Sequence, residues 1–134
     1  MNDQKQFCTF YLDDVLFGID VLKVQEIILF QEMTRVPMAS SVIRGLINLR
    51  GQVVTAMDLR IRLGLEERNF DESSINVIIR SDDEIVSSLV GRIGDVLEPD
   101  ESTYELPPKT ITPIVREFIS GIYKLEDRLL LIWL

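Results

Sequence analysis

The sequence predicts an all-β fold built from short strands, and three observations support this prediction. Short apolar runs, several of which alternate with polar side chains, recur along the 134 residues. Turn-forming residues separate these runs at intervals of roughly eight to twelve positions. The segments with helical character are each only a few residues long. Apolar residues make up 46% of the chain, enough for the core of one domain or two small lobes. This pattern is typical of small β-barrels.

A first hairpin is predicted at the start of the chain. Side chains alternate over residues 7–12, two aspartates at 13–14 are typical turn formers, and alternation resumes over residues 15–19. Cys8 lies in the first run, where a small buried apolar residue is expected rather than a reactive thiol. A single cysteine cannot form an internal disulfide, which fits a reducing cytoplasm.

A short helical turn and a strand are predicted next. Asp20 is placed to cap the turn, and residues 24–30 are rich in β-branched side chains. Glu26 is the one charge in that strand, and from the pattern alone it simply faces solvent. Residues 34–37 end in proline and predict a break, and residues 40–44 could form one helical turn.

A tight central hairpin is predicted where two apolar runs, residues 46–49 and 53–57, flank a short polar connection. Gly51 suits the turn because glycine adopts positive φ at no steric cost. Arg50 then stands at the hairpin tip. Spacing alone leaves two readings open for Arg50, an ordinary solvated turn cation or a charge presented to a partner.

A short helix is predicted directly after the central hairpin. Asp58 is well placed to cap it, residues 59–63 form it, and Gly64 ends it. Arg60 and Arg62 are expected to be solvated charges on this helix.

The middle of the chain contains an acidic connection and a second hairpin. Residues 66–74 are polar and are expected to form an exposed link. Residues 75–80 and 85–90 are expected strands around a turn at 81–84. The clustered acids of that turn lack the alternating ligands and the glycine of a calcium loop, so no metal site is expected there.

The C-terminal part predicts one helix and a last hairpin. Thr112 precedes a proline and can begin a helix over residues 113–118. Residues 119–125 and 128–134 are expected to pair across an acidic turn. Trp133 is expected to fill a gap in the core.

Composition narrows the class of function. The chain has 22 acidic and 14 basic residues, a net charge of −8, so its surface repels phosphate backbones and nucleic acid is not an expected partner. It contains no histidine and one cysteine, so the usual parts of nucleophilic and zinc sites are missing. A carboxylate pair remains possible, but the acids lie mainly at turns, where desolvation cannot easily raise a pKa. We therefore expect a binding module with no cofactor rather than an enzyme.

Membrane insertion is not expected either. The first six residues are mostly polar, and no apolar run approaches the roughly 20 residues needed to cross a bilayer. A cytoplasmic location is the expectation.

Several blocks of the sequence resemble, in order, the CheW-like domain family. The central block is Gly-Leu-Ile-Asn-Leu-Arg-Gly-Gln-Val-Val at 45–54, followed by Met-Asp-Leu-Arg at 57–60. Further matching blocks lie at residues 17–21, 24–27, 119–122 and 129–132. The resemblance implies two small five-stranded SH3-like barrels packed over a shared hydrophobic core. It also implies a first barrel at about 14–74 and a second at about 75–134 that includes the strand 7–12.

The resemblance further implies a non-catalytic chemotaxis adaptor. Proteins of this family couple the cytoplasmic tips of methyl-accepting chemoreceptors to the regulatory domain of the histidine kinase CheA. An alternative is a CheW-like module cut from a larger signalling protein, either the regulatory domain of the kinase or a receiver-linked coupling protein. A peptide-binding barrel outside signalling and a carboxylate enzyme are further alternatives.

By matching position, the resemblance assigns six partner-binding residues, which are Val24, Glu26, Ile27, Gly45, Arg50 and Gly51. The first three fall where the family lines its receptor-binding groove, and the last three fall on its glycine-arginine motif. We expect Glu26 and Arg50 to lie close enough to form an ion pair. One departure concerns Gly94, which stands where the family often has an aspartate.

Overall fold

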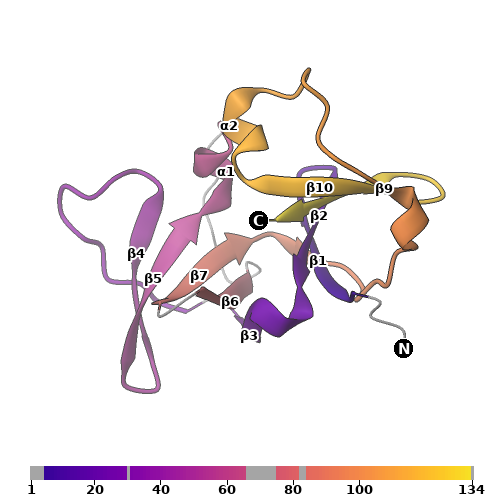
Figure 1. Ribbon diagram of the computed structural model, residues 1–134. Coiled ribbons are helices and arrows are strands. Elements are labelled where there is room, and N and C mark those ends of the chain that lie inside the picture. Colours follow the sequence, from indigo (N-terminus) through magenta and orange to yellow (C-terminus); the bar gives the residue numbers. More distant parts are fainter. Residues whose placement is uncertain (1–4, 30, 66–74, 82–83, 134) are drawn as a thin grey trace. The chain divides into compact units, whose positions relative to one another are not determined.

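The computed structural model describes residues 5–29, 31–65, 75–81 and 84–133, and Figure 1 shows their course. The chain divides into two compact units, each built around one β-sheet. We call residues 23–92 the central unit, and the residues up to 22 and from 93 onward the terminal unit. The all-β prediction is confirmed.

The terminal unit contains a sheet of six strands in the order β8-β1-β2-β11-β10-β9. Its strands are β1 (Phe7–Leu12), β2 (Val15–Asp20), β8 (Arg92–Ile93), β9 (Tyr104–Glu105), β10 (Ile119–Lys124) and β11 (Leu129–Trp133). β1 and β2 form one antiparallel hairpin, and β10 and β11 form another. β11 joins the two hairpins by pairing in parallel with β2. The hairpins predicted near both ends of the chain are therefore confirmed.

The core of the terminal unit combines residues from both of its chain segments. One buried cluster of the described residues consists of Phe7, Leu16, Tyr123, Leu130 and Ile132. Trp133 is only half-buried and stacks on Phe118 with ring centroids 5.5 Å apart. Its ring is therefore only partly enclosed, against Phe118. Cys8 is also half-buried, and burial raises the pKa of its thiol, which disfavours the reactive thiolate.

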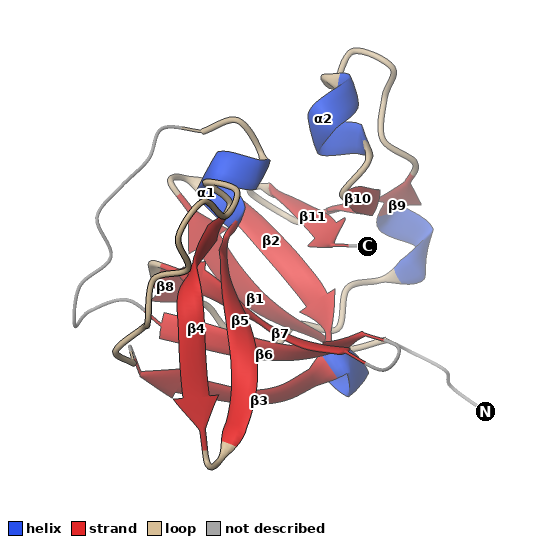
Figure 2. Cartoon of the chain, turned by 90° about the vertical axis from the view of Figure 1, so that its left-hand side faces the viewer, coloured by secondary structure: helices blue, strands red, loops and turns tan. Residues whose placement is uncertain are grey.

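The central unit contains a sheet of five strands in the order β3-β6-β7-β5-β4. Its strands are β3 (Val24–Leu29), β4 (Ile43–Leu49), β5 (Gln52–Asp58), β6 (Ile75–Ser81) and β7 (Glu84–Val90). β4 and β5 form the predicted central hairpin, and Figure 2 shows its turn at one end of the strands. β7 pairs in parallel with β5 and antiparallel with β6, which in turn pairs with β3. The buried residues described in this unit include two clusters, Ile47-Ala56-Leu89 and Leu49-Val54-Ile78.

Four short helices accompany the strands among the described residues. They are η1 (Val21–Lys23), α1 (Leu59–Arg62), η2 (Glu101–Thr103) and α2 (Pro113–Arg116). Two predicted caps are confirmed, since Asp20 Oδ1 accepts from Leu22 N and Asp58 Oδ1 accepts from Arg60 N, each at 2.9 Å. Thr112 precedes α2 as predicted, although its side chain makes no capping bond.

Two local predictions are wrong. The helical turn expected over residues 40–44 does not extend that far, because β4 begins at Ile43, which pairs with Met57. Arg60 is not a solvated charge, because only 5% of it is exposed. Arg62 is exposed as expected. The predicted acidic link at 66–74 lies outside the described residues.

The predicted division of strands between two barrels is also wrong. β6 and β7 were expected in the second barrel, but their pairing with β3 and β5 places them in the central unit. β2 was expected in the first barrel, but it pairs with β1 and β11 in the terminal unit. Parallel pairing carries no local turn signal, so the sequence pattern favours a boundary at the acidic, polar stretch instead. The shared core of two barrels stays a prediction.

Packing explains why the chain has glycine at position 94. Gly94 N donates to Thr9 O at 2.9 Å, and the buried Thr9 hydroxyl donates to Asp95 O. A Cβ on Gly94 would lie 2.5 Å from Thr9 Oγ1. The Thr9 side chain therefore occupies the space that an aspartate at this position would enter.

Gly94→Ala is expected to lower the free energy of unfolding by about 1 to 2 kcal/mol, because Thr9 must rotate and lose its bond to Asp95. Thr9→Ala removes the same bond and the obstructing oxygen. The double variant should therefore lose less than the sum of the two single losses. Urea unfolding of the four proteins measures this coupling, and strictly additive losses would contradict the packing explanation.

Candidate functional site

The tip of the β4–β5 hairpin is a two-residue turn made by Arg50 and Gly51. Leu49 pairs with Gln52 just before the turn. The φ angles of Arg50 and Gly51 are 50° and 86°, the left-handed conformation that two-residue hairpin turns of type I′ require at both positions. Gly51 N also donates to Asn48 Oδ1 at 2.9 Å. The predicted turn at Gly51 is confirmed.

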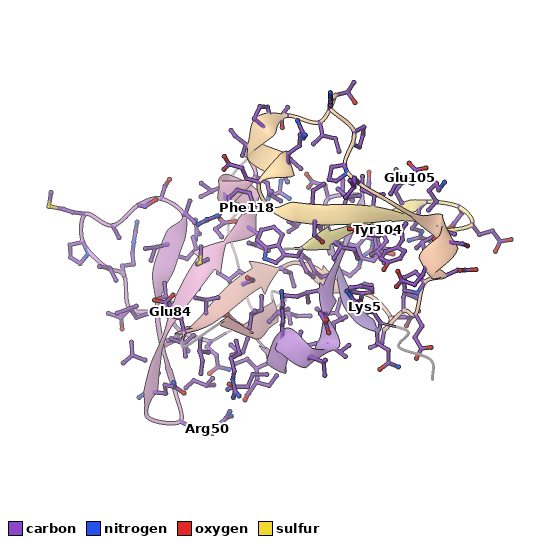
Figure 3. The ribbon with its side chains drawn as sticks, in the orientation of Figure 1. Lys5, Arg50, Glu84, Tyr104, Glu105 and Phe118 are labelled. Carbon is purple, nitrogen blue, oxygen red and sulfur yellow. The ribbon has the colours of Figure 1, made fainter. Side chains whose placement is uncertain are left out.

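Arg50 forms an ion pair with Glu26 on β3. Arg50 Nη2 donates to Glu26 Oε2, which confirms the expected pairing between residues 24 positions apart. The hydrogen bond from Arg50 lowers the pKa of the Glu26 carboxyl, so the pair is charged at neutral pH. The Arg50 side chain remains 66% exposed and that of Glu26 25% exposed. Figure 3 shows Arg50 at the far end of the hairpin. The guanidinium can thus meet a partner while Glu26 holds it.

The other two β3 residues of the predicted site lie on either side of Glu26. Ile27 is 42% exposed, and Val24 is half-buried. β3 is irregular between Val24 and Glu26, where the pairing with β6 shifts by one residue. The edge strand β3 therefore carries exposed apolar area at Ile27 and, at Glu26, the acid that pairs with Arg50 of the hairpin turn.

Gly45 lies away from the hairpin tip and is buried. A Cβ at this position would lie 2.8 Å from Thr34 O and 2.9 Å from Met33 Cβ. Thr34 and Leu46 exchange two backbone hydrogen bonds, at 2.9 and 2.8 Å, so the segment after β3 is held against β4. This packing accounts for a glycine at position 45 without any contact to a partner.

A buried charged cluster lies beside α1 and was not predicted from the sequence. Asp58 is 0% exposed, and Arg44 Nη1 lies 3.8 Å from its Oδ2. That oxygen accepts no hydrogen bond among the described residues. Burial raises the pKa of Asp58, against the opposing pull of its backbone hydrogen bonds and of Arg44 and Arg60. The signal was in the sequence, because Asp58 continues the alternation of the buried residues Val54 and Ala56.

The described residues offer no metal cluster and no membrane-spanning helix. They contain no group of three or more cysteine, aspartate or glutamate side chains arranged to hold a metal ion. None of the described helices has the length and apolar character required to cross a membrane.

Comparison with known proteins identifies the family. The family model of the CheW-like domain matches residues 6–134, nearly the whole chain. The chain belongs to the CheW-like domain family. The match includes β3 and the β4–β5 hairpin, so the ion pair between Glu26 and Arg50 lies in this CheW-like domain.

Individual relatives agree with the family assignment. The CheW-like chain is 34% identical to the chemotaxis protein CheW of Bacillus subtilis over 126 residues, which cover 94% of this chain and 81% of the relative. It is 29% identical to the chemotaxis protein CheW of Klebsiella aerogenes, over 96% of this chain and 77% of the relative. Among solved structures, it resembles the scaffolding protein TtCheW from Thermoanaerobacter tengcongensis with a TM-score of 0.89 and 30% identity. That match covers 98% of this chain and 89% of the other.

Proposed function

We propose that this CheW-like chain is a cytoplasmic, non-catalytic adaptor that couples chemoreceptor tips to the histidine kinase CheA. The observation that carries the proposal is the exposed ion pair between Glu26 and Arg50, presented on a strand edge and a hairpin tip. Relatives named as chemotaxis proteins and a relative described as a scaffold support a binding role in such a pathway.

The proposed contact surface divides between two elements of the central unit. Val24, Glu26 and Ile27 on β3 are proposed to contact the receptor tip, with Ile27 supplying exposed apolar area. Arg50 and Gly51 form the hairpin tip beside it. An exposed apolar residue next to a charged pair provides both burial and orientation for a docking protein.

Gly45 is proposed to act differently from the other five residues. Its Cβ position is filled by the backbone of Thr34, so a substitution there displaces the segment after β3 before it affects any partner. We therefore assign Gly45 a supporting role, in which it keeps this segment packed on β4.

Arg50→Ala is expected to reduce the capture of the kinase, of the receptor, or of both, from cytoplasmic extract by at least about tenfold, because charged contacts at interfaces are costly to truncate. The chain is immobilised, and the two partners are quantified among the retained proteins. Arg128→Ala is the matched control, because Arg128 is also an exposed arginine paired with a neighbouring acid, Asp127, but lies in the terminal unit.

Thermal unfolding of the three proteins accompanies the capture experiment. Equal melting temperatures with selective loss for Arg50→Ala support the proposed function. If the unmodified chain captures neither the kinase nor a receptor, the adaptor function is wrong.

A further inference from the structure

We propose that Asn48 is a positioning residue that holds Arg50 in a strained backbone conformation, from which its guanidinium reaches a carboxylate of the partner. This inference has two parts. The binding half, in which Arg50 meets a carboxylate of the partner, rests on the proposed function. The structural half, that the hairpin tip is strained and that Asn48 holds it, stands on the geometry of the tip alone.

The strain lies in the backbone of Arg50. Its φ of 50° is in the left-handed region, where a side chain with a Cβ crowds the following carbonyl oxygen. Two-residue type I′ turns favour Asn-Gly, because both residues tolerate positive φ. Here the second position is Gly51, as the turn prefers, but the first is arginine. The turn therefore contains a residue that is unfavourable for folding, and such outliers cluster at functional sites.

Asn48 supplies a side-chain hydrogen bond across this turn, in addition to the backbone pairing of Leu49 with Gln52. Asn48 Oδ1 accepts from Gly51 N at 2.9 Å across the turn. Asn48 itself is exposed and pairs with Val53 across the hairpin. Without this bond Gly51 can leave its conformation more easily, and the φ of Arg50 can relax toward negative values. That change would turn the Cα–Cβ bond of Arg50, and with it the guanidinium, away from Glu26 on β3.

The held guanidinium suits a carboxylate on the partner. A guanidinium carries five N–H donors in a planar fork, and Glu26 accepts from Nη2. Two thirds of the Arg50 side chain stays exposed, so further donors can meet a second acid. Arginine pairs with carboxylates through two parallel bonds when its orientation is fixed. The expected arrangement is an arginine held by Glu26 on one side and by the carboxylate of the partner on the other.

The structural half predicts opposite changes in stability for two substitutions. Arg50→Asn gives the turn its preferred Asn-Gly pair and is expected to raise the melting temperature by about 3 °C. Asn48→Ala is expected to lower it by a similar amount and to speed hydrogen exchange of the Gly51 amide by about tenfold, because that amide loses its acceptor. Asn48→Ser should restore part of the protection, since a hydroxyl can accept the same bond less well.

The binding half uses capture of the kinase and of the receptor by the same variants. Arg50→Asn should lose at least about tenfold in capture of one partner although it is the more stable protein. Asn48→Ala should lose about threefold to tenfold, and Asn48→Ser should recover part of this loss. Val53→Thr is the control, because Val53 is 70% exposed and lies opposite Asn48 but makes no bond to the turn.

The outcomes are distinguishable. Wild-type exchange at Gly51 and wild-type capture in Asn48→Ala would overturn the positioning role. A melting temperature of Arg50→Asn below that of Arg50→Ala would overturn the strain, because both variants lose the ion pair with Glu26. If the unmodified chain captures no partner, the proposed function fails, and the melting and exchange measurements still decide the structural half.

Discussion

Asp58→Ala is expected to lower the free energy of unfolding by about 2 to 3 kcal/mol. The substitution removes the cap of α1, where Asp58 Oδ1 accepts from Arg60 N at 2.9 Å. It also leaves the guanidinium of Arg44 without the buried carboxylate 3.8 Å away, and Arg60 is itself buried. Urea unfolding measures the loss. Asp127→Ala, which removes an exposed aspartate, is the control and should change stability by less than about 0.5 kcal/mol.

The same carboxylate predicts how stability depends on pH. Burial raises the pKa of Asp58 in the folded protein above its ordinary value of 3.8, so the folded state binds this proton more tightly than the unfolded chain. The stabilisation that this proton gives is complete below pH 3.8 and is lost as the pH rises through the folded pKa. Asp58→Asn removes the titration and can keep the capping acceptor.

The measurement is the difference in unfolding free energy between the unmodified chain and Asp58→Asn at a series of pH values. The unmodified chain should lose stability relative to Asp58→Asn as the pH rises from 3.8, and the difference should then level off. If the unmodified chain instead gains stability relative to Asp58→Asn over the same range, the attraction of Arg44 and Arg60 for the carboxylate outweighs the effect of burial on its pKa.

Gly45→Ala is expected to lower the free energy of unfolding by about 2 kcal/mol, because its Cβ would lie 2.8 Å from Thr34 O, a backbone atom that no side-chain rotation can move. The two hydrogen bonds between Thr34 and Leu46 should lengthen or break. Denaturant unfolding measures the loss. Gly91→Ala is the matched control, since a Cβ there meets nothing within 4 Å.

This substitution also separates two roles for Gly45. Destabilisation accompanied by reduced capture of partners agrees with a supporting role. Unchanged stability with lost capture would instead mean that Gly45 contacts the partner directly, and would contradict the packing described here.

The sequence was informative for several features that depend on neighbouring residues. The turn at Arg50 and Gly51 and the cap at Asp58 follow from residue types a few positions apart, and the structure has both. The parallel pairing of β5 with β7 follows from no local signal, because strands that pair in parallel are distant in sequence. The division between the units was therefore misplaced.

At the candidate site, too, a contact between residues distant in sequence did not follow from local patterns. Spacing alone does not distinguish between a solvated turn cation at Arg50 and a charge presented to a partner. Its pairing with Glu26 joins the hairpin turn to β3, between residues 24 positions apart, and family resemblance rather than periodicity suggested it. From its position on a short helix, Arg60 was expected to face solvent. The strand alternation that buries Asp58 indicates instead that this helix begins at a buried position.

The role of the hairpin tip is tested most directly by titrating the purified chain against the purified regulatory domain of the kinase and against a receptor tip. Titration calorimetry with the unmodified chain, Arg50→Lys and Arg50→Ala gives the Kd for each pair. The expected result is binding by the unmodified chain, a loss of at least about tenfold in Arg50→Ala for at least one partner, and an intermediate Kd for Arg50→Lys. The same Kd for all three proteins at equal melting temperature would contradict a binding role for Arg50.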